Sequence, residues 1–479
     1  MEQHREMLSE EPDRHSTDRP ASVCVAAALR PATRRAFLGA SSAALGSGLL
    51  AACGIGPQAA PAGSTGQTGQ TLRDQRLTFL HWWTDSLGPG NNDFMAWAAA
   101  TFKERTGAQV ELVDGRPGGG LNEKLITMIT GGLAPDATFC SVVFGRDNYD
   151  AGMVKNLSSY IAKAADLGDK EFFDSAKKFR SKGNDTFGIP VMGPESLTFT
   201  VNQNMLNAEG FDPKGGDLKT WDDLVRIGQR MTKMSGSDFQ QIGLLPQGIS
   251  LPWLAAWLYS NNASLTNPEE TKYLLDAPAT LEAVQFSVDL MHKHRLGPPL
   301  DAPNRPSNAR QAFTSGQVAI IHDSSSIRLL NAPPDFRFWI VPVPKGPRGT
   351  SLASASWTNF VSVPTDAKNP DAGVEWTRFF TGLDAQVEKL RRLNSPSPRV
   401  KFYDTPEWKK AVEAEPNLAR IPEVARLPGA YPYLRYNRLN AEVRPLFDDI
   451  IRTKIGVNQG LAEAQKLADQ VMAEPVRVQ

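Results

Sequence analysis

The chain has 479 residues, of which 41% are hydrophobic and 22% charged, which is the composition of a globular protein long enough to bury more than one core. Lysine plus arginine and aspartate plus glutamate each total 52, so the formal net charge is zero. A balanced charge excludes an overall electrostatic attraction to nucleic acid or to an anionic surface as the basis of function.

The N-terminal region has the features of an export signal. Arg34 and Arg35 precede an uncharged, mostly apolar run at 40–52, which ends directly before Cys53. A positive segment, a short apolar run and small residues at its end are typical of an export signal, and the run is shorter than the roughly 20 residues that span a bilayer. The arginine pair is similar to a twin-arginine signal. The Leu-Ala-Ala-Cys ending resembles the lipobox of bacterial lipoproteins. We therefore expect an export signal at 1–52 and lipidation of Cys53.

Residues 53–71 are rich in Gly, Ala, Pro, Gln, Ser and Thr, which is typical of a flexible tether. The only cysteines are Cys24, Cys53 and Cys140. Because the first lies in the leader and the second in the lipobox, we expect no internal disulfide in the mature chain. Stability must then come from packing of the hydrophobic core.

From residue 77 onward, strand-like and helix-like segments alternate. Residues 77–81 and 109–113 have the length and apolar content of buried strands, and a helical pattern at 92–105 lies between them. A second helical pattern at 121–130 precedes a predicted strand at 137–143. Strands separated by helices of this length predict βαβ units and a largely parallel sheet. In such a sheet, ligands bind beyond the carboxyl ends of the strands.

The rest of the chain adds further strands and helices. Residues 196–202 alternate between apolar and polar side chains, as a half-buried strand does. Thr220 is suited to cap the helix that follows it, and Pro252 suits the first turn of another. The remaining predicted elements are helices at 280–294, 367–381 and 386–392, two helices within 442–472, and strands at 318–321 and 337–343.

Several short sequences occur in a characteristic order along the mature chain, at 81–83, 102–107, 134–137, 187–190, 220–224, 312–320 and 341–347. This order resembles that of the bacterial extracellular solute-binding proteins of family 1, which serve sugar importers. The resemblance implies an α/β, two-lobed periplasmic-binding-protein-like fold of type II, with hinge-linked lobes around a central ligand cleft. Lobe 1 would comprise 72–192 plus 323–365, and lobe 2 would comprise 193–322 plus 366–479.

The resemblance also implies a function. The protein would be the substrate-binding component of an ABC importer, binding a mono- or oligosaccharide between its lobes and delivering it to membrane permease subunits. It would be a monomer without enzymatic activity, cofactor, bound metal or nucleic-acid partner. The lipid on Cys53 would hold it outside the cytoplasm, in the periplasm or on the outer face of the cell membrane.

A sugar ring has apolar C–H faces and a belt of hydroxyl groups, so its site needs aromatic rings together with carboxylates or amides. Trp82 and Trp83 follow the first strand, where side chains alternate, so we expect one to face the ligand and the other the core. Trp253 and Trp257 share a helix face, which suits either a ligand contact or a stripe of core residues.

Further candidates follow from the resemblance. Glu195 lies at an expected crossing between lobes, where relatives have an acidic sugar ligand; a solvated loop carboxylate is the alternative. Asp323 and Ser324 lie at a second expected crossing, where a turn-forming aspartate is the alternative, and Trp357 matches a glycine-rich loop of relatives. The full set of candidate ligand-binding residues is Trp82, Trp83, Asp85, Ser141, Glu195, Trp253, Trp257, Asp323, Ser324 and Trp357.

Two other classes of protein fit parts of the sequence. A secreted carbohydrate-active hydrolase would need two carboxylates about 5–10 Å apart. Pairs such as Asp222 and Asp223, or Asp448 and Asp449, are adjacent on predicted helices, so their side chains diverge. A binding protein for a non-sugar solute such as glycerol phosphate is the second alternative. The mature chain contains no His-Glu-x-x-His sequence, and we expect no metal site.

Overall fold

The computed structural model describes residues 72–116, 120–325, 332–333, 335–431 and 433–476. Residues Gly69–Gln479 form one compact unit. The predicted export signal, tether and Cys53 lie outside the described residues. Within the described part of the chain, no helix has both the length and the apolar character needed to span a membrane.

The first of two main sheets has five strands in the order β2-β1-β3-β13-β6. Strand β1 is parallel to β2 and β3, whereas β13 is antiparallel to β3 and β6. The parallel part confirms the predicted βαβ units. The bounds are β1 (Arg76–His81), β2 (Gln109–Asp114), β3 (Ala137–Cys140), β6 (Ile189–Pro190) and β13 (Phe360–Ser362).

The helices predicted between these strands are present. Helix α1 (Asn91–Thr106) joins β1 to β2, and α2 (Leu121–Thr130) lies between β2 and β3. Helix α1 buries Phe94, Ala98 and Phe102, which are four residues apart and therefore share one helix face. This face packs in the hydrophobic core of the first sheet.

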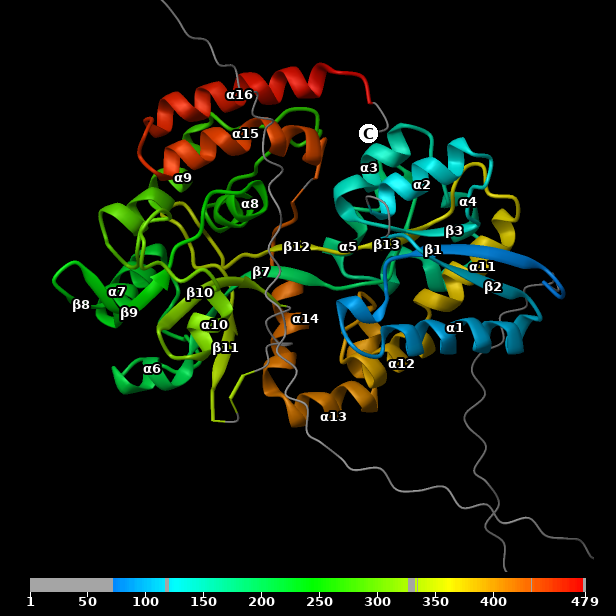
Figure 1. Ribbon diagram of the computed structural model, residues 1–479, viewed down its shortest axis with the longest axis horizontal. Helices are drawn as coiled ribbons and strands as arrows, with labels where there is room; N and C mark the ends of the chain where they lie inside the picture. Colours follow the sequence, from blue (N-terminus) through cyan, green and yellow to red (C-terminus); the bar gives the residue numbers. More distant parts are fainter. Residues whose placement is uncertain (1–71, 117–119, 326–331, 334, 432, 477–479) are drawn as a thin grey trace, which may run out of the picture. The chain divides into compact units, whose positions relative to one another are not determined.

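Two helices from a later part of the chain complete the first lobe. Helices α11 (Pro370–Thr381) and α12 (Leu383–Leu393) lie beside α1 (Figure 1). Trp376 and Phe380 of α11 contact Phe79 of β1, with ring centroids 5.3 and 5.4 Å apart. Burial of these rings fixes α11 against the sheet.

The second sheet has six strands, in the order β11-β7-β10-β9-β8, with β12 also paired to β7. Strands β9 and β10 are parallel, so their carboxyl ends lie at the same edge. Strand β7 is antiparallel to β10, β11 and β12. The bounds are β7 (Glu195–Asn202), β8 (Lys233–Ser235), β9 (Asp238–Leu245), β10 (Val318–Ser324), β11 (Phe338–Val341) and β12 (Ala355–Trp357).

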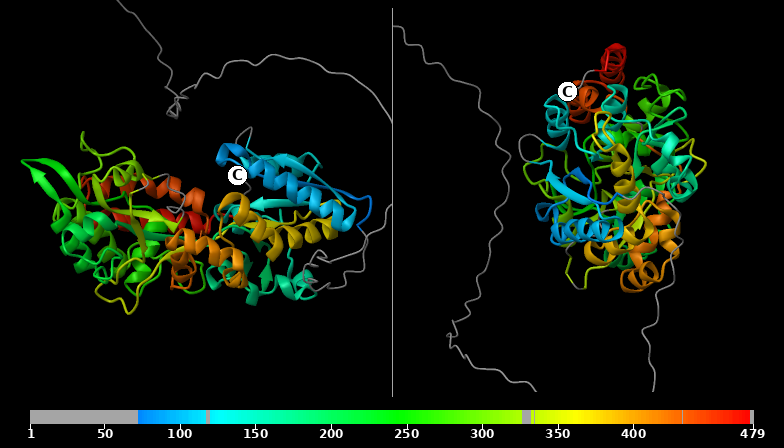
Figure 2. Two further views of the ribbon diagram at one scale, coloured as in Figure 1. Left: turned by 90° about the horizontal axis from the view of Figure 1, so that it is seen from below. Right: turned by 90° about the vertical axis from the view of Figure 1, so that its right-hand side faces the viewer.

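Helices of the second lobe pack around this sheet. Helix α7 (Trp221–Met231) begins with the predicted cap: the Thr220 hydroxyl accepts a hydrogen bond from the backbone N–H of Asp223. Helix α8 (Leu251–Ser260) has its proline in the first turn, as predicted. The other helices of this lobe are α6 (Gln203–Ala208), α9 (Pro278–His292), α10 (Ala309–Thr314), α15 (Tyr436–Ile451) and α16 (Val457–Ala473). Seen from below, the blue α1 lies in one half of the compact unit and the red C-terminal helices α15 and α16 lie toward the other half (Figure 2).

The expected lobe boundaries differ from this arrangement at two segments. Segment 323–365 is expected in lobe 1, but β11 and β12 within it pair with β7 of the second sheet. Segment 366–479 is expected in lobe 2, but α11 and α12 pack with the first sheet. Periodicity identifies a strand or a helix, but it does not determine which of two sheets that element joins.

Two chain segments cross between the sheets side by side. One leads from β6 to β7, and the other leads from β12 to β13 (Figure 1). The backbone N–H of Val191 donates to the carbonyl of Asn359 at 3.0 Å, and the Thr358 hydroxyl donates to the carbonyl of Met192. These two crossings are therefore hydrogen-bonded to each other. A third connection between the lobes leads from α12 to α15.

The remaining elements are short or lie at the periphery. They are β4 (Ser181–Lys182), β5 (Asp185–Thr186), α3 (Val142–Asp150), α4 (Ser158–Ile161), α5 (Asp174–Lys178), α13 (Pro406–Ala414) and α14 (Arg420–Ala425), with 3-10 turns at Asp85–Leu87, Ala165–Leu167, Asp169–Glu171, Val400–Asp404 and Pro416–Ala419.

Candidate ligand-binding site

Each sheet has a hollow at the carboxyl ends of its parallel strands, which is where α/β sheets bind ligands. The first hollow, of about 390 Å³, follows β1 and β3 and includes the start of α2. The second follows β9 and lies beside β10 and α8. The two hollows belong to different lobes.

The tandem tryptophans after β1 have different environments, as the alternation predicts. Trp82 is half-buried, lines the first hollow and stacks on Phe139, with ring centroids 5.1 Å apart and an interplanar angle of 21°. Trp83 is only 4% exposed and packs in the core against Phe94 and Phe139. Trp83 is therefore a core residue, and of the two tryptophans Trp82 lines the hollow, together with Phe139 and Phe144.

Uncharged polar groups form much of the remaining lining. Ser141 lies in the hollow and caps α3, its hydroxyl accepting from the backbone N–H of Val143 at 3.4 Å. The predicted strand at 137–143 therefore ends at Cys140, because this cap starts a helix instead. The side chain of Asn148 donates to that of Asn122 at 2.9 Å, and both line the hollow.

A more polar hollow adjoins the ends of β1 and β2. Asp85 lines it, and its carboxylate accepts from the backbone N–H of Asn92 at 2.9 Å, in the first turn of α1. Arg116 forms an ion pair with Asp114 at 3.0 Å. Burial raises the pKa of Asp114, but hydrogen bonds from Arg116 outweigh this, so the net pKa is below its usual value. His81 also lines this hollow.

The two tryptophans of α8 also differ in how far they are buried. Trp257 is 4% exposed and meets Trp221 edge to face, with ring centroids 5.4 Å apart, so most of its surface is packed in the core, and the rest lines the second hollow. Trp253 is half-buried, lines the second hollow and stacks on His322 at 3.9 Å. His322 in turn stacks on Phe199 at 4.1 Å. Burial lowers the pKa of His322 to about 3, so this imidazole is neutral at physiological pH.

Glu195 and Trp357 lie together at the crossing between the lobes. They are partners in the pairing of β7 with β12, and both are half-buried. One oxygen of Glu195 accepts from the Ser325 hydroxyl at 3.3 Å. The sequence therefore predicted the location of Glu195 at a crossing correctly.

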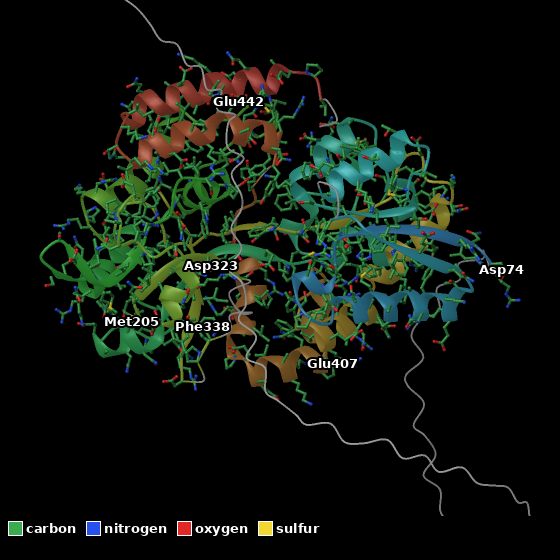
Figure 3. The ribbon with its side chains drawn as sticks, in the orientation of Figure 1. Asp74, Met205, Asp323, Phe338, Glu407 and Glu442 are labelled. Atoms are coloured by element: carbon green, nitrogen blue, oxygen red, sulfur yellow. The ribbon has the colours of Figure 1, made fainter. Side chains whose placement is uncertain are left out.

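Asp323 and Ser324 lie elsewhere than expected. Both are in β10, inside the second sheet, where Asp323 pairs with Thr198 of β7, so the chain does not cross between lobes here. Figure 3 labels Asp323 on the second lobe. The carboxylate accepts two hydrogen bonds from Arg310, each 2.7 Å long, and its side chain is 13% exposed. Asp323 is thus paired with Arg310, and neither Asp323 nor Ser324 is among the residues that line the two hollows at the strand ends.

Sequence reasoning missed His322, Asn122 and Asn148. Nothing in their local sequence distinguishes them, because they reach the hollows only through the pairing of distant strands and helices. The one available indication was the position of Asn122 at the start of a predicted helix that follows a strand.

The fold and the paired hollows define a two-lobed α/β binding protein of type II. The model of the bacterial extracellular solute-binding protein family matches residues 86–387. This match covers more than half of the chain, so the protein belongs to that family, as the sequence predicted. A curated relative, the arabinooligosaccharide-binding protein of Bacillus subtilis strain 168, is 21% identical over 288 residues. The aligned part spans 57% of this chain and 62% of the relative, less than two thirds of its length.

Solved structures have the same fold at low sequence identity. An ABC transporter solute-binding protein from Thermotoga lettingae, bound to α-D-tagatose, has a TM-score of 0.64 and 16% identity, covering 83% of this chain and 100% of that chain. The cyclic α-maltosyl-1,6-maltose-binding protein from Arthrobacter globiformis has a TM-score of 0.67 and 18% identity, covering 83% and 98%. A cyclo/maltodextrin-binding protein complexed with maltotetraose has a TM-score of 0.67 and 17% identity, covering 83% and 97%. The predicted fold is thereby confirmed.

Proposed function

We propose that the protein is the substrate-binding component of an ABC importer and binds a carbohydrate between its two lobes. The observation that carries the proposal is the pair of hollows, one in each lobe, each lined by a half-buried tryptophan. A hydroxyl-rich ring needs flat apolar area together with fixed hydrogen-bonding groups. Trp82 and Trp253 supply the first, and Ser141, Asn122 and Asn148 supply groups of the second kind.

The ligands named for the similar proteins support this class of ligand. They are an arabino-oligosaccharide, tagatose, a cyclic maltosyl-maltose and maltotetraose, all of which are carbohydrates. These ligands range from one sugar unit to four or more, so they do not determine the size of the carbohydrate that this chain binds.

Capture then depends on hinge closure. The two crossings provide the hinge, and closure brings the hollow at Trp82 and the hollow at Trp253 onto opposite sides of one ligand. Glu195 and Trp357, at the crossing itself, would contact the ligand between the lobes. No bond of the carbohydrate is made or broken, so the bound sugar is released unchanged to the permease subunits.

Two observations favour a neutral carbohydrate over the alternatives. Among the described residues that line the first hollow, Glu123 is the only one with a charged side chain, and a negative group there opposes binding of a solute such as glycerol phosphate. Hydrolysis needs a pair of suitably spaced carboxylates. Of the acidic candidates near the crossing, Asp323 is already held by Arg310.

We also propose that the protein works outside the cytoplasm, as the description of its family indicates. Residues 1–52 would direct its export, lipidation of Cys53 would anchor it, and 53–71 would tether the folded part to the membrane. The support for these three assignments is the sequence pattern alone. We propose that the anchored protein acts as a monomer.

Calorimetric titration of the soluble chain beginning at residue 54 tests the proposal. Maltotriose, mannobiose, arabinotriose and tagatose are the carbohydrate probes, and glycerol 3-phosphate is the anionic control. We expect at least one carbohydrate to bind and to stabilise the fold by about 2.7 kcal/mol at a hundredfold excess over Kd. Binding of glycerol 3-phosphate alone, or cleavage of a probe during the titration, would contradict the proposal.

A further inference from the structure

His322, which lines the hollow in the second lobe, has a buried ring nitrogen to which the described residues supply no hydrogen-bond partner. His322 lines this hollow together with Gln247 and Trp253. Its Nε2 atom is buried and has no hydrogen-bond partner among the described residues. Buried polar atoms are nearly always paired, so an unpaired one beside a hollow requires an explanation.

The packing of His322 holds its ring in place. The ring lies between Phe199, at 4.1 Å and 24°, and Trp253, at 3.9 Å and 18°, while the Trp257 ring is 5.1 Å away. The aromatic rings on both faces leave little room for the imidazole to tilt. Because burial keeps the ring neutral, it carries one N–H donor and one acceptor nitrogen.

The hollow has room for one small polar group. Its free volume is about 20 Å³, which is enough for roughly one group of the size of water. Leu244, Leu254 and Leu290 form apolar parts of the wall. A hydroxyl group fits this space, and an entire sugar ring does not.

We infer that His322 determines ligand specificity: one hydroxyl group of the bound carbohydrate enters the hollow beside Trp253 and hydrogen-bonds Nε2. The inference rests on the proposed function. A site built to pair one hydroxyl discriminates strongly against a ligand that lacks it, because the buried nitrogen then stays unpaired. The apolar edge of the sugar contacts the Trp253 ring, which also stacks on His322. The aromatic surface and the hydrogen-bonding nitrogen therefore lie next to each other.

The test variant is His322→Phe, which keeps an aromatic ring between Phe199 and Trp253 and removes both nitrogens. The matched control is His294→Phe, which lies in neither hollow. Maltotriose, mannobiose, arabinotriose and tagatose are titrated calorimetrically against the wild type and both variants. Loss of one neutral hydrogen bond predicts an affinity about 3- to 12-fold lower for His322→Phe and unchanged for the control.

A series of monodeoxy derivatives of the tightest-binding probe identifies the hydroxyl group. One derivative should bind the wild type more weakly than the parent sugar does. The same derivative and the parent sugar should bind His322→Phe with equal affinity. Equal binding of every probe and derivative by the wild type and His322→Phe would overturn the inference, making His322 a core residue or a water ligand, while the proposed function stands. If no carbohydrate binds the wild type, the proposed function itself fails.

Folding of the variant is checked by thermal melting. Removing an unpaired buried nitrogen should leave the melting temperature of His322→Phe unchanged or higher. If the variant is instead less stable, the deoxy series on the wild type decides alone. In that series, a uniform response to loss of each hydroxyl group overturns the inference.

Discussion

Glu195 and Trp357 are partners across the pairing of β7 with β12, at the point where each strand meets a crossing between the lobes. Their side chains therefore lie at the proposed hinge, where a captured ligand would touch both halves of the protein. The Ser325 hydroxyl donates to Glu195, which orients the carboxylate before any ligand arrives. This arrangement links the candidate site directly to the segment that the proposed closure would bend.

Replacing Trp82 or Trp253 by alanine should weaken carbohydrate binding about 10- to 100-fold, because each substitution removes a half-buried indole ring that lines its hollow. Calorimetric titration with the tightest-binding probe measures the change. Trp339→Phe is the control, since Trp339 lines neither hollow. Full affinity in both alanine variants would place the ligand elsewhere.

Acidification should destabilise the fold through two histidines, His81 and His322, each of which has a buried ring nitrogen. Burial lowers the pKa of His81 to about 4 and that of His322 to about 3, from 6.5. Between pH 6.5 and about 4 the unfolded chain binds protons on these rings and the folded protein does not, which costs up to about 1.4 kcal/mol per pH unit for each histidine. Asp147 acts in the opposite sense, because burial raises its pKa to about 6.

Comparing variants isolates the histidine contribution from that of Asp147. The free energy of unfolding, measured by denaturant titration at several values between about pH 7 and about pH 5, should fall less steeply for His322→Phe than for the wild type. Parallel curves for the two proteins would mean that His322 titrates normally in the folded state.

Arg310→Gln should destabilise the protein by about 1–2 kcal/mol, because it leaves the largely buried Asp323 carboxylate without its partner. Carbohydrate affinity should change less than about twofold, since the ion pair lies outside both hollows. The control is Arg226→Gln, which removes a more exposed ion pair with Asp223 and should cost less than about 1 kcal/mol. If Arg310→Gln instead lost most of its carbohydrate affinity without a change in stability, Asp323 would belong to the ligand site.

Cys53→Ala should leave export intact and abolish membrane retention, because the lipid, and not the folded part, would hold the protein at the membrane. Fractionation of cells into membrane and soluble extracytoplasmic fractions measures this. Replacing Arg34 and Arg35 together by lysine should block export altogether. Unchanged membrane association of Cys53→Ala would show that the lipobox assignment is wrong.

Local patterns predicted the elements well. The alternation of strand and helix from residue 77, the Thr220 cap and the proline at the start of α8 are all present. Each depends on residues close together in the sequence, where spacing and capping chemistry act directly. The separation of Trp82 from Trp83 follows from the same local alternation.

Such local patterns could not predict which distant strands and helices pair with each other. The sheet that β11 joins and the docking of α11 on β1 depend on contacts across more than a hundred residues. The same holds for His322, whose stacking partners come from β7 and α8. For Asp323, the local sequence suggested a turn, whereas Arg310 from α10 makes it one half of an ion pair.

The two segments that cross between the sheets are hydrogen-bonded to each other, through Val191, Met192, Thr358 and Asn359. A joined pair of backbones resists twisting and sideways shear far more than two loose linkers would, and it flexes most easily about the line that runs across both. The proposed closure of the two lobes should therefore follow mainly one direction, which would bring the two tryptophan-lined faces together in the same relative position each time.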